Sequence, residues 1–327
     1  MSPRPRVFVT RQLPGAALGR LRDETELEVW RDDLPPPREQ LLAAVRDAEG
    51  LLCLLTDQID DELLAAAPKL RVVSTMAVGY DNIDVESATR RRIVVANTPD
   101  VLTESTADLA FALLLAAARR VVEGDRVTRE GRWTTWHPSF LLGRDIHDAT
   151  LGIVGLGQIG LAVARRARGF GMRLLYTSPS RRQDAERELA LAHVSFDELL
   201  AEADFISAHV PLTPKTHHMF NADAFRRMKA TAIFVNTSRG QVVDEAALHH
   251  ALDSRTIAGA AIDVTEVEPL PKQDALLRLP NLIVTPHIGS ASVATRARMA
   301  EMAAENLLAG LRGDEPPHCV NPEALER

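Results

Sequence analysis

Short apolar runs rich in β-branched residues alternate with stretches of helical spacing along most of the chain. In the first part of the chain the apolar runs fall at residues 6–10, 27–30, 51–55, 71–75 and 93–96. Between them, segments such as residues 38–48 and 60–67 place apolar side chains at helical intervals. Strands and helices that alternate in this way are typical of βαβ units in a parallel sheet.

A second alternating series begins at Thr150. Its predicted strands are residues 151–154, 173–176, 205–208, 232–235, 260–263 and 282–285. Six strands separated by helices are the number expected of a complete dinucleotide-binding sheet. The pattern therefore predicts an α/β protein with two doubly wound parallel-sheet domains.

Two longer helical patterns flank the second series. The first is expected to start at Thr103 or Ser105 and to run toward Val122, and its nearly unbroken apolar stretch indicates burial between domains or subunits. The second, residues 292–312, is amphipathic and is expected to cross back to the first domain. The predicted domains are therefore a discontinuous one, residues 1–98 with 287–327, and a continuous one, residues 99–286.

Composition narrows the class of protein. A length of 327 residues suggests two domains, and 46% hydrophobic with 25% charged residues is typical of soluble globular proteins. The net charge of -7 argues against nucleic acid or an acidic membrane as the main partner. No apolar stretch approaches a membrane span, and the apolar run near the N-terminus is too short for a signal-peptide core. The two cysteines, Cys53 and Cys319, lack metal-ligand spacing, so we expect a cytoplasmic protein without a metal site.

A glycine-rich turn stands between the first strand and first helix of the second series. Gly155 permits the tight turn, Gly157 lets the backbone approach a pyrophosphate, and Gly160 allows close packing of strand and helix. The helix, expected to begin at Gly160, would point its N-terminus at the phosphates. We expect this turn, with Gln158 and Ile159, to bind a nicotinamide dinucleotide; the alternative is an ordinary strand–turn–helix.

The end of the next strand predicts which nicotinamide is bound. An enzyme that uses NAD usually carries Asp or Glu there, but this chain has no acid after Tyr176 until Asp184. Hydroxyl groups and two arginines occupy the interval instead, and they would attract a 2′-phosphate. The residues concerned are Ser178, Ser180, Arg181 and Arg182. We therefore predict NADP(H) in preference to NAD(H); the alternative is a solvated basic loop.

Three chemically active residues each follow a predicted strand of the second series. They are Arg239, Glu268 and His287. Residues that follow parallel strands converge on one sheet edge, where ligands bind. A guanidinium, a carboxylate and an imidazole at that edge suit proton transfer to an anionic substrate. Each could singly be an ordinary surface or turn residue, but together, behind the glycine turn, they indicate an oxidoreductase.

Several motifs resemble the D-isomer-specific 2-hydroxyacid dehydrogenases over essentially the whole chain. They are residues 78–84, the glycine turn at 155–160, and residues 236–240, 263–269 and 286–289. Within this family the chain is most similar to the glyoxylate/hydroxypyruvate reductases. The details that support this are residues 52–55, the arm Trp133-Thr134-Thr135-Trp136, the acid-free residues 176–178 and residues 288–291.

The resemblance implies a Rossmann-type nucleotide domain, a flavodoxin-like substrate domain and a cleft between them. It implies that Arg239 binds the substrate carboxylate, that Glu268 orients His287, and that His287 donates a proton to the carbonyl oxygen. Further expected substrate-binding residues are Leu54, Val78, Gly79 and Gly289, and further cofactor-binding residues are Pro211, Thr237 and Asp263.

The implied reaction is NADPH-dependent reduction of a small 2-keto acid, glyoxylate or hydroxypyruvate, to the D-2-hydroxy acid. Pyruvate or larger 2-keto acids remain open as substrates, as do the activities of phosphoglycerate and phosphite dehydrogenases. Formate dehydrogenases resemble the family too, but Gln is expected where Glu268 stands. Corepressors that use the dinucleotide to assemble are a rival of another class. We also expect a homodimer, with the helix from Ser105 and the arm around Trp136 as the contact; the alternative for the arm is ordinary packing.

Overall fold

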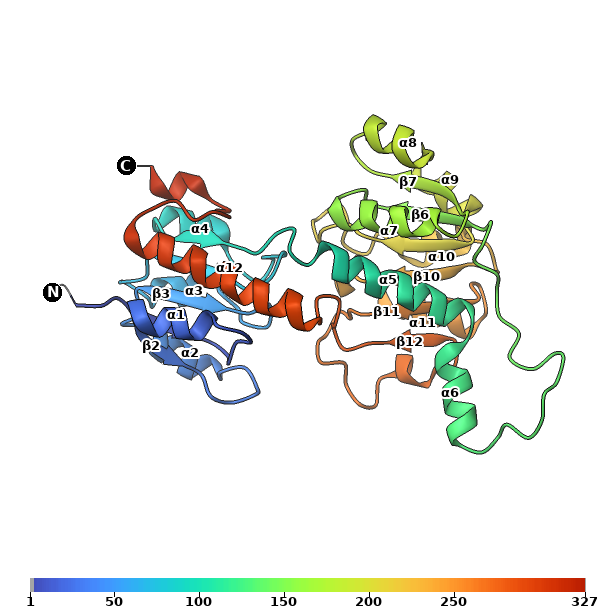
Figure 1. Cartoon of the computed structure of the whole chain (residues 1–327), viewed down its shortest axis with the longest axis horizontal. Coiled ribbons are helices and arrows are strands. Elements are labelled where there is room, and N and C mark those ends of the chain that lie inside the picture. Colours follow the sequence, from blue (N-terminus) through green and yellow to red (C-terminus); the bar gives the residue numbers. More distant parts are fainter. Residues whose placement is uncertain (1–2, 327) are drawn as a thin grey trace. The chain divides into compact units, whose positions relative to one another are not determined.

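The computed structural model describes residues 3–326, which form two compact α/β units (Figure 1). One unit holds the chain up to Leu102 and again from Ser290, and the other is Thr103–Gly289. These boundaries fall after residues 102 and 289, whereas the sequence places them after 98 and 286. His287 and Gly289 consequently belong to the continuous unit.

The discontinuous unit is built on a parallel sheet of five strands with the order β2-β1-β3-β4-β5. This is the flavodoxin-like strand order. The strands are β1 (Arg6–Val9), β2 (Glu26–Val29), β3 (Gly50–Cys53), β4 (Val72–Thr75) and β5 (Val94–Ala96). Each coincides with a predicted apolar run. In β1, β3, β4 and β5 most residues are buried, and such strands read as short continuous apolar stretches, whereas the edge strand β2 has no buried residue.

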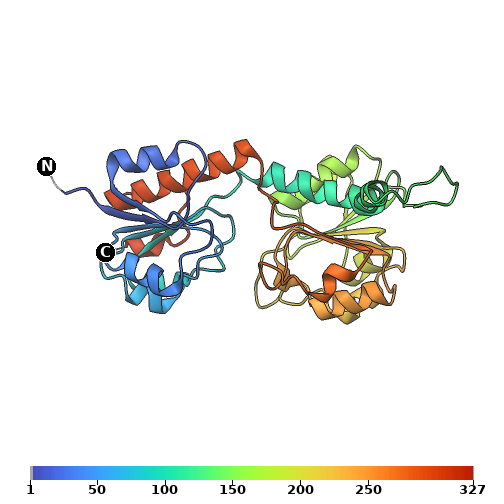
Figure 2. The same ribbon diagram turned by 90° about the horizontal axis from the view of Figure 1, so that it is seen from below.

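Helices cover both faces of this sheet. Figure 2 shows α1 (Ala17–Glu24) and α12 (Val293–Arg312) on one face, and α2 (Arg38–Val45), α3 (Asp61–Ala65) and α4 (Val85–Arg90) on the other. The predicted return of the last helix to this unit is confirmed, since Ser74 Oγ of β4 donates to the carbonyl oxygen of Ala303 at 2.8 Å. A short 3-10 helix, Pro322–Leu325, ends the unit.

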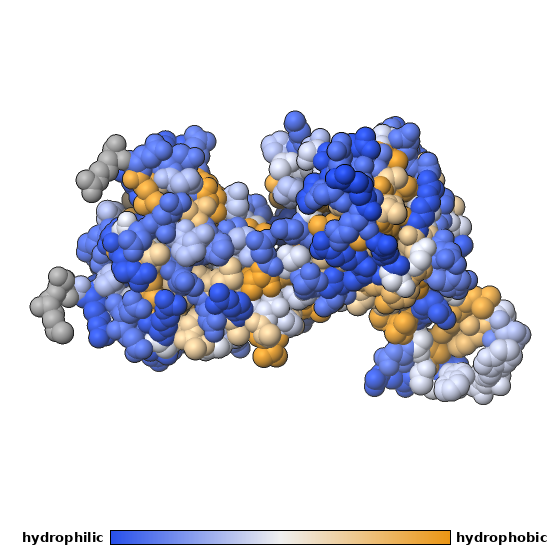
Figure 3. Space-filling model, turned by 45° about the horizontal axis from the view of Figure 1, so that its top comes forward, coloured by the Kyte–Doolittle hydropathy of each residue, from blue (hydrophilic) through white to orange (hydrophobic). Residues whose placement is uncertain are grey.

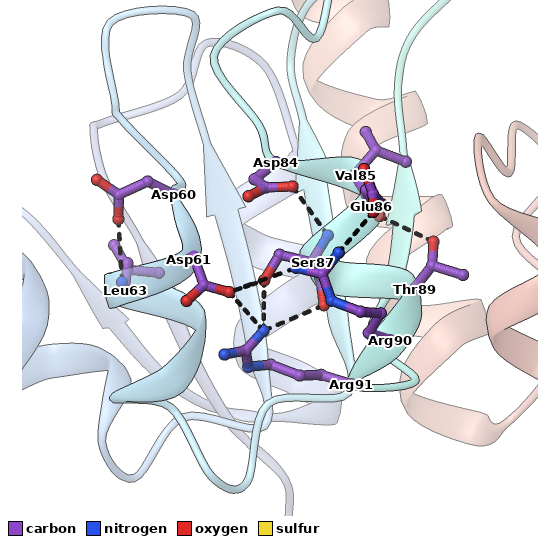
Figure 4. Close-up of polar contacts among 10 residues, drawn as sticks. All are labelled: Asp60, Asp61, Leu63, Asp84, Val85, Glu86, Ser87, Thr89, Arg90 and Arg91. Atoms are coloured by element: carbon purple, nitrogen blue, oxygen red, sulfur yellow. Dashed lines mark hydrogen bonds and ion pairs between the residues drawn. The ribbon is translucent and has the colours of Figure 1, made fainter.

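Polar residues fix α3 and α4 to each other (Figure 4). Asp60 and Asp84 cap the two helices by accepting from the N–H groups of Leu63 at 3.0 Å and Ser87 at 2.8 Å. Between the helices, Asp61 accepts hydrogen bonds from Ser87 Oγ at 2.5 Å and Arg91 Nη1 at 2.7 Å. These contacts hold the helices on their side of the sheet.

The continuous unit is built on a parallel sheet of seven strands with the order β12-β11-β10-β9-β6-β7-β8. The order reverses at β6, which places the topological switch point between β6 and β9. The strands are β6 (Thr150–Val154), β7 (Arg173–Thr177), β8 (Leu191–His193), β9 (Phe205–Ala208), β10 (Ile233–Asn236), β11 (Gly259–Ile262) and β12 (Leu282–Val284). The sequence missed β8, a short edge strand in which only Leu191 is buried.

Two apolar layers hold the helices of this unit on its sheet. One face carries α5 (Thr103–Ala118), α7 (Gln158–Arg168) and α8 (Gln183–Leu189), and the other carries α9 (Phe196–Glu202), α10 (Ala222–Arg227) and α11 (Glu245–Asp253). Short 3-10 helices lie at Gly240–Val242 and Ala275–Arg278. The second layer includes a cluster of three phenylalanines, in which the ring centroid of Phe234 lies 4.6 Å from that of Phe220 and 5.8 Å from that of Phe225.

The first long helix is shorter than predicted. It ends at Ala118, Arg120 takes a left-handed φ of 53°, and a separate helix α6 (Val121–Arg129) follows. The N–H of Arg144 donates to the carbonyl oxygen of Ala118 at 2.8 Å. A distant segment thus satisfies one of the last carbonyl groups of α5, which the local apolar pattern could not reveal.

Candidate active site

The imidazole of His287 and the carboxylate of Glu268 form the central contact of the site. His287 Nδ1 lies 2.7 Å from Glu268 Oε2, and Glu268 Oε1 accepts from the N–H of Thr265 at 3.1 Å. Burial alone would raise the pKa of Glu268, but these hydrogen bonds and the positive charges of His287 and Arg239 outweigh it, so its pKa is lowered. A carboxylate therefore faces Nδ1, and proton exchange with another molecule would use Nε2.

The backbone of the His287 loop is held by Asp263, which follows β11. Asp263 is 1% exposed and accepts three hydrogen bonds, from Thr285 Oγ1 at 2.5 Å, the N–H of Ile288 at 2.9 Å and the N–H of Gly289 at 2.7 Å. His287 itself has a left-handed φ of 53°, and its N–H donates to the carbonyl oxygen of Asp263 at 2.9 Å. The sequence predicts Asp263 as a cofactor-binding residue; in the structure its carboxylate positions the loop that carries His287.

Arg239 reaches the same edge of the sheet from the end of β10. Asn236 Nδ2 donates to the carbonyl oxygen of Arg239 at 2.9 Å, and Arg239 Nη1 donates to that of Ser238 at 2.9 Å. At Gly240 a Cβ atom would lie 1.9 Å from the carbonyl carbon of Thr265. Only glycine permits this approach between the segments that carry Arg239 and Glu268.

Sequence reasoning missed a pair of glutamates that joins the Glu268 segment to α11. The N–H of Glu266 donates to Glu245 Oε1 at 2.7 Å, and the N–H of Glu245 donates to Glu266 Oε1 at 3.2 Å. His218 Nε2 lies 2.9 Å from the same Glu266 oxygen. Burial raises the pKa of Glu245, and the charge of Glu266 adds to this effect. Asp244 caps α11, the helix that carries Glu245, by accepting from the N–H of Ala247 at 3.0 Å.

The glycine turn between β6 and α7 has the tight turn and the close strand–helix approach that were expected of Gly155 and Gly160. Gly155 has a left-handed φ of +95°, and a Cβ atom on Gly160 would lie 2.2 Å from the carbonyl oxygen of Gly155. A Cβ atom on Gly157 would meet nothing within 4 Å. The helix begins at Gln158 rather than at Gly160 as predicted, and Gly157 gives it no side-chain cap. The turn therefore offers open space at a helix N-terminus, which fits the pyrophosphate of a dinucleotide.

Other predicted cofactor residues lie at the same edge of the sheet. Thr237 follows β10 and is 8% exposed, and its Oγ1 has no hydrogen-bond partner within residues 3–326. Pro211 follows β9 and is exposed, and its carbonyl oxygen accepts from Thr216 Oγ1 at 2.6 Å. A buried hydroxyl without a partner in the protein suits a bound polar group.

The predicted phosphate-binding segment after β7 is less basic than its sequence implies. Arg181 is paired with Glu186, whose Oε2 lies 2.9 Å from Nη2, and Arg182 Nε lies 3.4 Å from Asp184 Oδ1. Ser178 is half-buried and Ser180 is exposed. The prediction recognised Asp184 as the first acid after β7 but overlooked Glu186, which the first turn of α8 brings back to the arginine.

The predicted substrate-binding residues of the other unit follow neighbouring strands of its sheet. Leu54 follows β3, and its N–H donates to the carboxylate of Asp57 at 2.7 Å; that carboxylate is 3% exposed and also accepts from Thr10 Oγ1 at 2.5 Å. Burial raises the pKa of Asp57 against the effect of these hydrogen bonds. Val78 and Gly79 follow β4 and are half-buried. Both segments lie at the carboxyl edge of this sheet.

Residues 3–326 contain neither a metal-ligand cluster nor a membrane-spanning helix. No group of three or more His, Cys, Asp or Glu residues in this part of the chain could hold a metal ion. None of the helices described for these residues is long and apolar enough to span a bilayer.

The chain is similar to known proteins in both sequence and structure. A family model described as D-isomer specific 2-hydroxyacid dehydrogenase, NAD binding domain, matches residues 111–289. The chain is 56% identical over 324 residues to a glyoxylate reductase of Korarchaeum cryptofilum, covering 99% of this chain and 98% of the relative. A crystal structure of a Thermus thermophilus protein superposes with a TM-score of 0.91 at 51% identity, covering 96% of this chain and 99% of that one.

A second similar structure is that of a relative whose name includes its cofactor. It is the NADPH-dependent glyoxylate/hydroxypyruvate reductase of Sinorhizobium meliloti in complex with NADP and malonate. It superposes with a TM-score of 0.86 at 35% identity and covers 99% of each chain.

Proposed function

The chain belongs to the D-isomer specific 2-hydroxyacid dehydrogenases, a family of NAD(P)-dependent oxidoreductases, and from this premise we propose that it reduces glyoxylate and hydroxypyruvate with NADPH. The products would be the corresponding D-2-hydroxy acids. The observation that carries the proposal is the 2.7 Å contact between His287 and Glu268 in the unit that contains the glycine turn. The names of the relatives at high identity support the choice of substrate.

Three side chains divide the work of the proposed reaction. Arg239 binds the substrate carboxylate, because a guanidinium presents two parallel donors to such a group. His287 donates a proton from Nε2 to the carbonyl oxygen, and Glu268 holds the ring through Nδ1 and favours its charged form. The bound nicotinamide supplies the hydride. Leu54, Val78, Gly79 and Gly289 stay predictions for the substrate site.

The cofactor is held, in this proposal, by the glycine turn and the segment after β7. Gly157 leaves the backbone open at the start of α7, and the buried Thr237 hydroxyl offers a polar contact at the same sheet edge. Ser178, Ser180, Arg181 and Arg182 would contact the adenosine ribose and its 2′-phosphate. Gln158, Ile159 and Pro211 stay predictions as further cofactor contacts.

The test follows the absorbance of the reduced nicotinamide, with glyoxylate and hydroxypyruvate and with NADPH and NADH in parallel. Rapid oxidation of NADPH with both acids is the expected result. A preference for NADH would retain the dehydrogenase and remove the assignment of the two arginines. Turnover of phosphoglycerate or phosphite alone would favour those rival dehydrogenases. Dinucleotide binding without turnover of any acid would favour the corepressor class.

We also propose that the arm and α6 bind a second copy of this chain. Apolar side chains gather on this projection of the continuous unit (Figure 3). The exposed residues are Val121 at 56%, Val122 at 53%, Trp133 at 60%, Trp136 at 79%, Phe140 at 44% and Leu142 at 65%. So many large apolar groups on one surface are typical of an interface. Sedimentation should show a dimer, and the double variant Trp133→Ser with Trp136→Ser should weaken it. An unchanged mass would refute this contact.

A cytoplasmic location stays a prediction from the sequence.

A further inference from the structure

We propose that Glu186 sets how strongly this chain prefers NADP(H), because its carboxylate holds Arg181 in the free protein and competes with a 2′-phosphate for it. This inference rests on the proposed function, since it concerns the same cofactor site. It adds a specificity-determining residue that weakens, rather than creates, the preference for the phosphorylated cofactor.

The contact between Arg181 and Glu186 is bidentate. Arg181 Nε donates to Glu186 Oε1 at 2.9 Å, and Arg181 Nη2 donates to Oε2 at 2.9 Å. Paired N–H groups facing two carboxylate oxygens form the strongest common geometry between these side chains. A phosphate would use the same two donors, so the carboxylate and the 2′-phosphate compete for one guanidinium.

The protein anchors the acid rather than the arginine. The Glu186 side chain is 14% exposed, and its Oε1 also accepts from the hydroxyl of Tyr176 at 2.7 Å. Tyr176 is fully buried, and its hydroxyl accepts from the N–H of Arg182 at 2.8 Å. The Arg181 side chain, by contrast, is 61% exposed. When a phosphate binds, the guanidinium is therefore the group free to turn while the carboxylate stays in place.

The carboxylate stays charged throughout any practical assay range. The hydrogen bonds from Arg181 and Tyr176 lower the pKa of Glu186 to about 2. The charge of Glu186 therefore does not change as the pH changes near neutrality. Asp184 opposes Arg182 in the same way at 3.4 Å, so two acids offset the two arginines of the segment.

The two cofactors should respond differently to this balance. A 2′-phosphate gains attraction if Arg181 is released and loses repulsion if the nearby acid is neutralised. A 2′-hydroxyl carries no charge and gains little from either change. Neutralising Glu186 should therefore raise affinity for the phosphorylated nucleotide selectively.

Calorimetric titration with adenosine 2′,5′-bisphosphate and with AMP tests this without relying on turnover. Glu186→Gln should bind the bisphosphate about two- to fivefold more tightly, the range expected for loss of one partly exposed ion pair. Affinity for AMP should change less than about twofold. Tyr176→Phe, which removes one anchor of the carboxylate, should give a smaller shift in the same direction.

Glu188→Gln is the matched control. Glu188 lies on the same helix, α8, but pairs with Arg165 of α7 at 3.3 Å. The Glu188→Gln substitution removes the same charge from a nearby position and leaves the contact between Glu186 and Arg181 intact. A similar gain in bisphosphate affinity in this variant would show a general charge effect and overturn the proposal.

Arg181→Ala separates this inference from the proposed function. If Arg181→Ala weakens bisphosphate binding but Glu186→Gln does not strengthen it relative to AMP, the competition is refuted while the NADPH assignment stands. If Arg181→Ala has no effect on either nucleotide, the competition fails; the NADPH assignment fails as well only if Arg181→Ala and Arg182→Ala together leave the cofactor preference unchanged. Selective strengthening in Glu186→Gln, lost in the double variant with Arg181→Ala, is the result that supports it.

Discussion

Two regions at the carboxyl edge of one sheet hold their charged groups in different ways. After β11 and β12, the carboxylate of Asp263 is 1% exposed and binds two backbone N–H groups and a threonine hydroxyl. After β7, the charges of Arg181 and Arg182 are instead balanced by side chains of α8. In the first region, a buried carboxylate fixes the position of a loop. In the second region, arginines form ion pairs in which a ligand could take the place of the acidic side chain.

The difference reflects what each region is proposed to do. Proton transfer needs an imidazole already oriented before the substrate arrives, because reorientation during the reaction would add to the barrier. Cofactor binding needs donors that are satisfied in the free protein yet can turn toward a phosphate. Buried contacts to backbone groups suit the first task, and half-exposed ion pairs suit the second.

Removing the proton donor should give the largest effect. His287→Ala should lower kcat about 10²–10⁴-fold, the usual contribution of general acid–base catalysis, while NADP affinity stays unchanged. Steady-state kinetics and a cofactor titration measure the two quantities. His250→Ala on α11, an exposed position, is the control. Turnover within a few fold of the unsubstituted enzyme would contradict the role of His287.

Removing the loop's buried anchor should come next. Asp263→Ala leaves three donors without their acceptor and should lower the free energy of unfolding by about 3 kcal/mol or more. Urea unfolding measures this loss, with Asp253→Ala at the exposed end of α11 as the control. If Asp263→Ala were as stable as Asp253→Ala, the buried carboxylate of Asp263 would not anchor the loop as described.

Two glycine substitutions should separate folding from cofactor binding in the turn between β6 and α7. Gly157→Ala meets nothing within 4 Å, so stability should change by less than about 0.5 kcal/mol, while dinucleotide affinity should fall about tenfold. Gly160→Ala would place Cβ 2.2 Å from the Gly155 carbonyl oxygen and should destabilise the fold by about 1–3 kcal/mol. Thermal unfolding measures the stability of the two variants, and calorimetry measures their affinity for the dinucleotide. Unchanged affinity in Gly157→Ala would remove the turn from the cofactor site.

The pH response of Glu268 should give the smallest effect. Because its pKa in the folded protein is lowered from 4.5, the carboxylate stabilises the fold above about pH 4.5, and this contribution is lost as pH falls through the folded pKa. Glu268→Gln should therefore be less stable than the unsubstituted protein near neutrality, by about 1 kcal/mol or less, and should match it in acid. Unfolding at several pH values tests this.

The same variant should change the pH profile of the reduction. Without the carboxylate, the His287 ring loses its charged partner, so the acidic or basic limb of the activity profile should move. Rates measured from acid to alkaline pH reveal the shift. A superimposable profile would mean that the 2.7 Å contact does not act in the reaction.

Local pattern predicted much of this molecule. Buried strands appeared as apolar runs, and Gly155 was identified as a turn residue that takes a positive φ. The order of residues after the strands predicted that Glu268 and His287 meet, because parallel strands deliver their carboxyl ends to one edge. The last helix was expected to be amphipathic and to cross back to the first unit, and it lies in that unit.

Contacts between distant segments were not predictable in this way. The end of α5 at Ala118 depends on the N–H of Arg144, and β8 is too short and exposed to show an apolar run. Glu245 and Glu266 lie 21 residues apart and pair across an α-helix start and a loop. The hydrophobic periodicity of the chain does not indicate these contacts.

The amino-acid sequence by itself determined all the described strands except β8, the glycine turn and the identity of the chemical groups at the sheet edge. These follow from backbone stereochemistry and side-chain periodicity, which act over a few residues. Only the tertiary structure decided that Glu186 pairs with Arg181 and that Asp263 holds the His287 loop. Electrostatic and hydrogen-bond energies depend on distances between groups from different elements, and folding alone sets those distances.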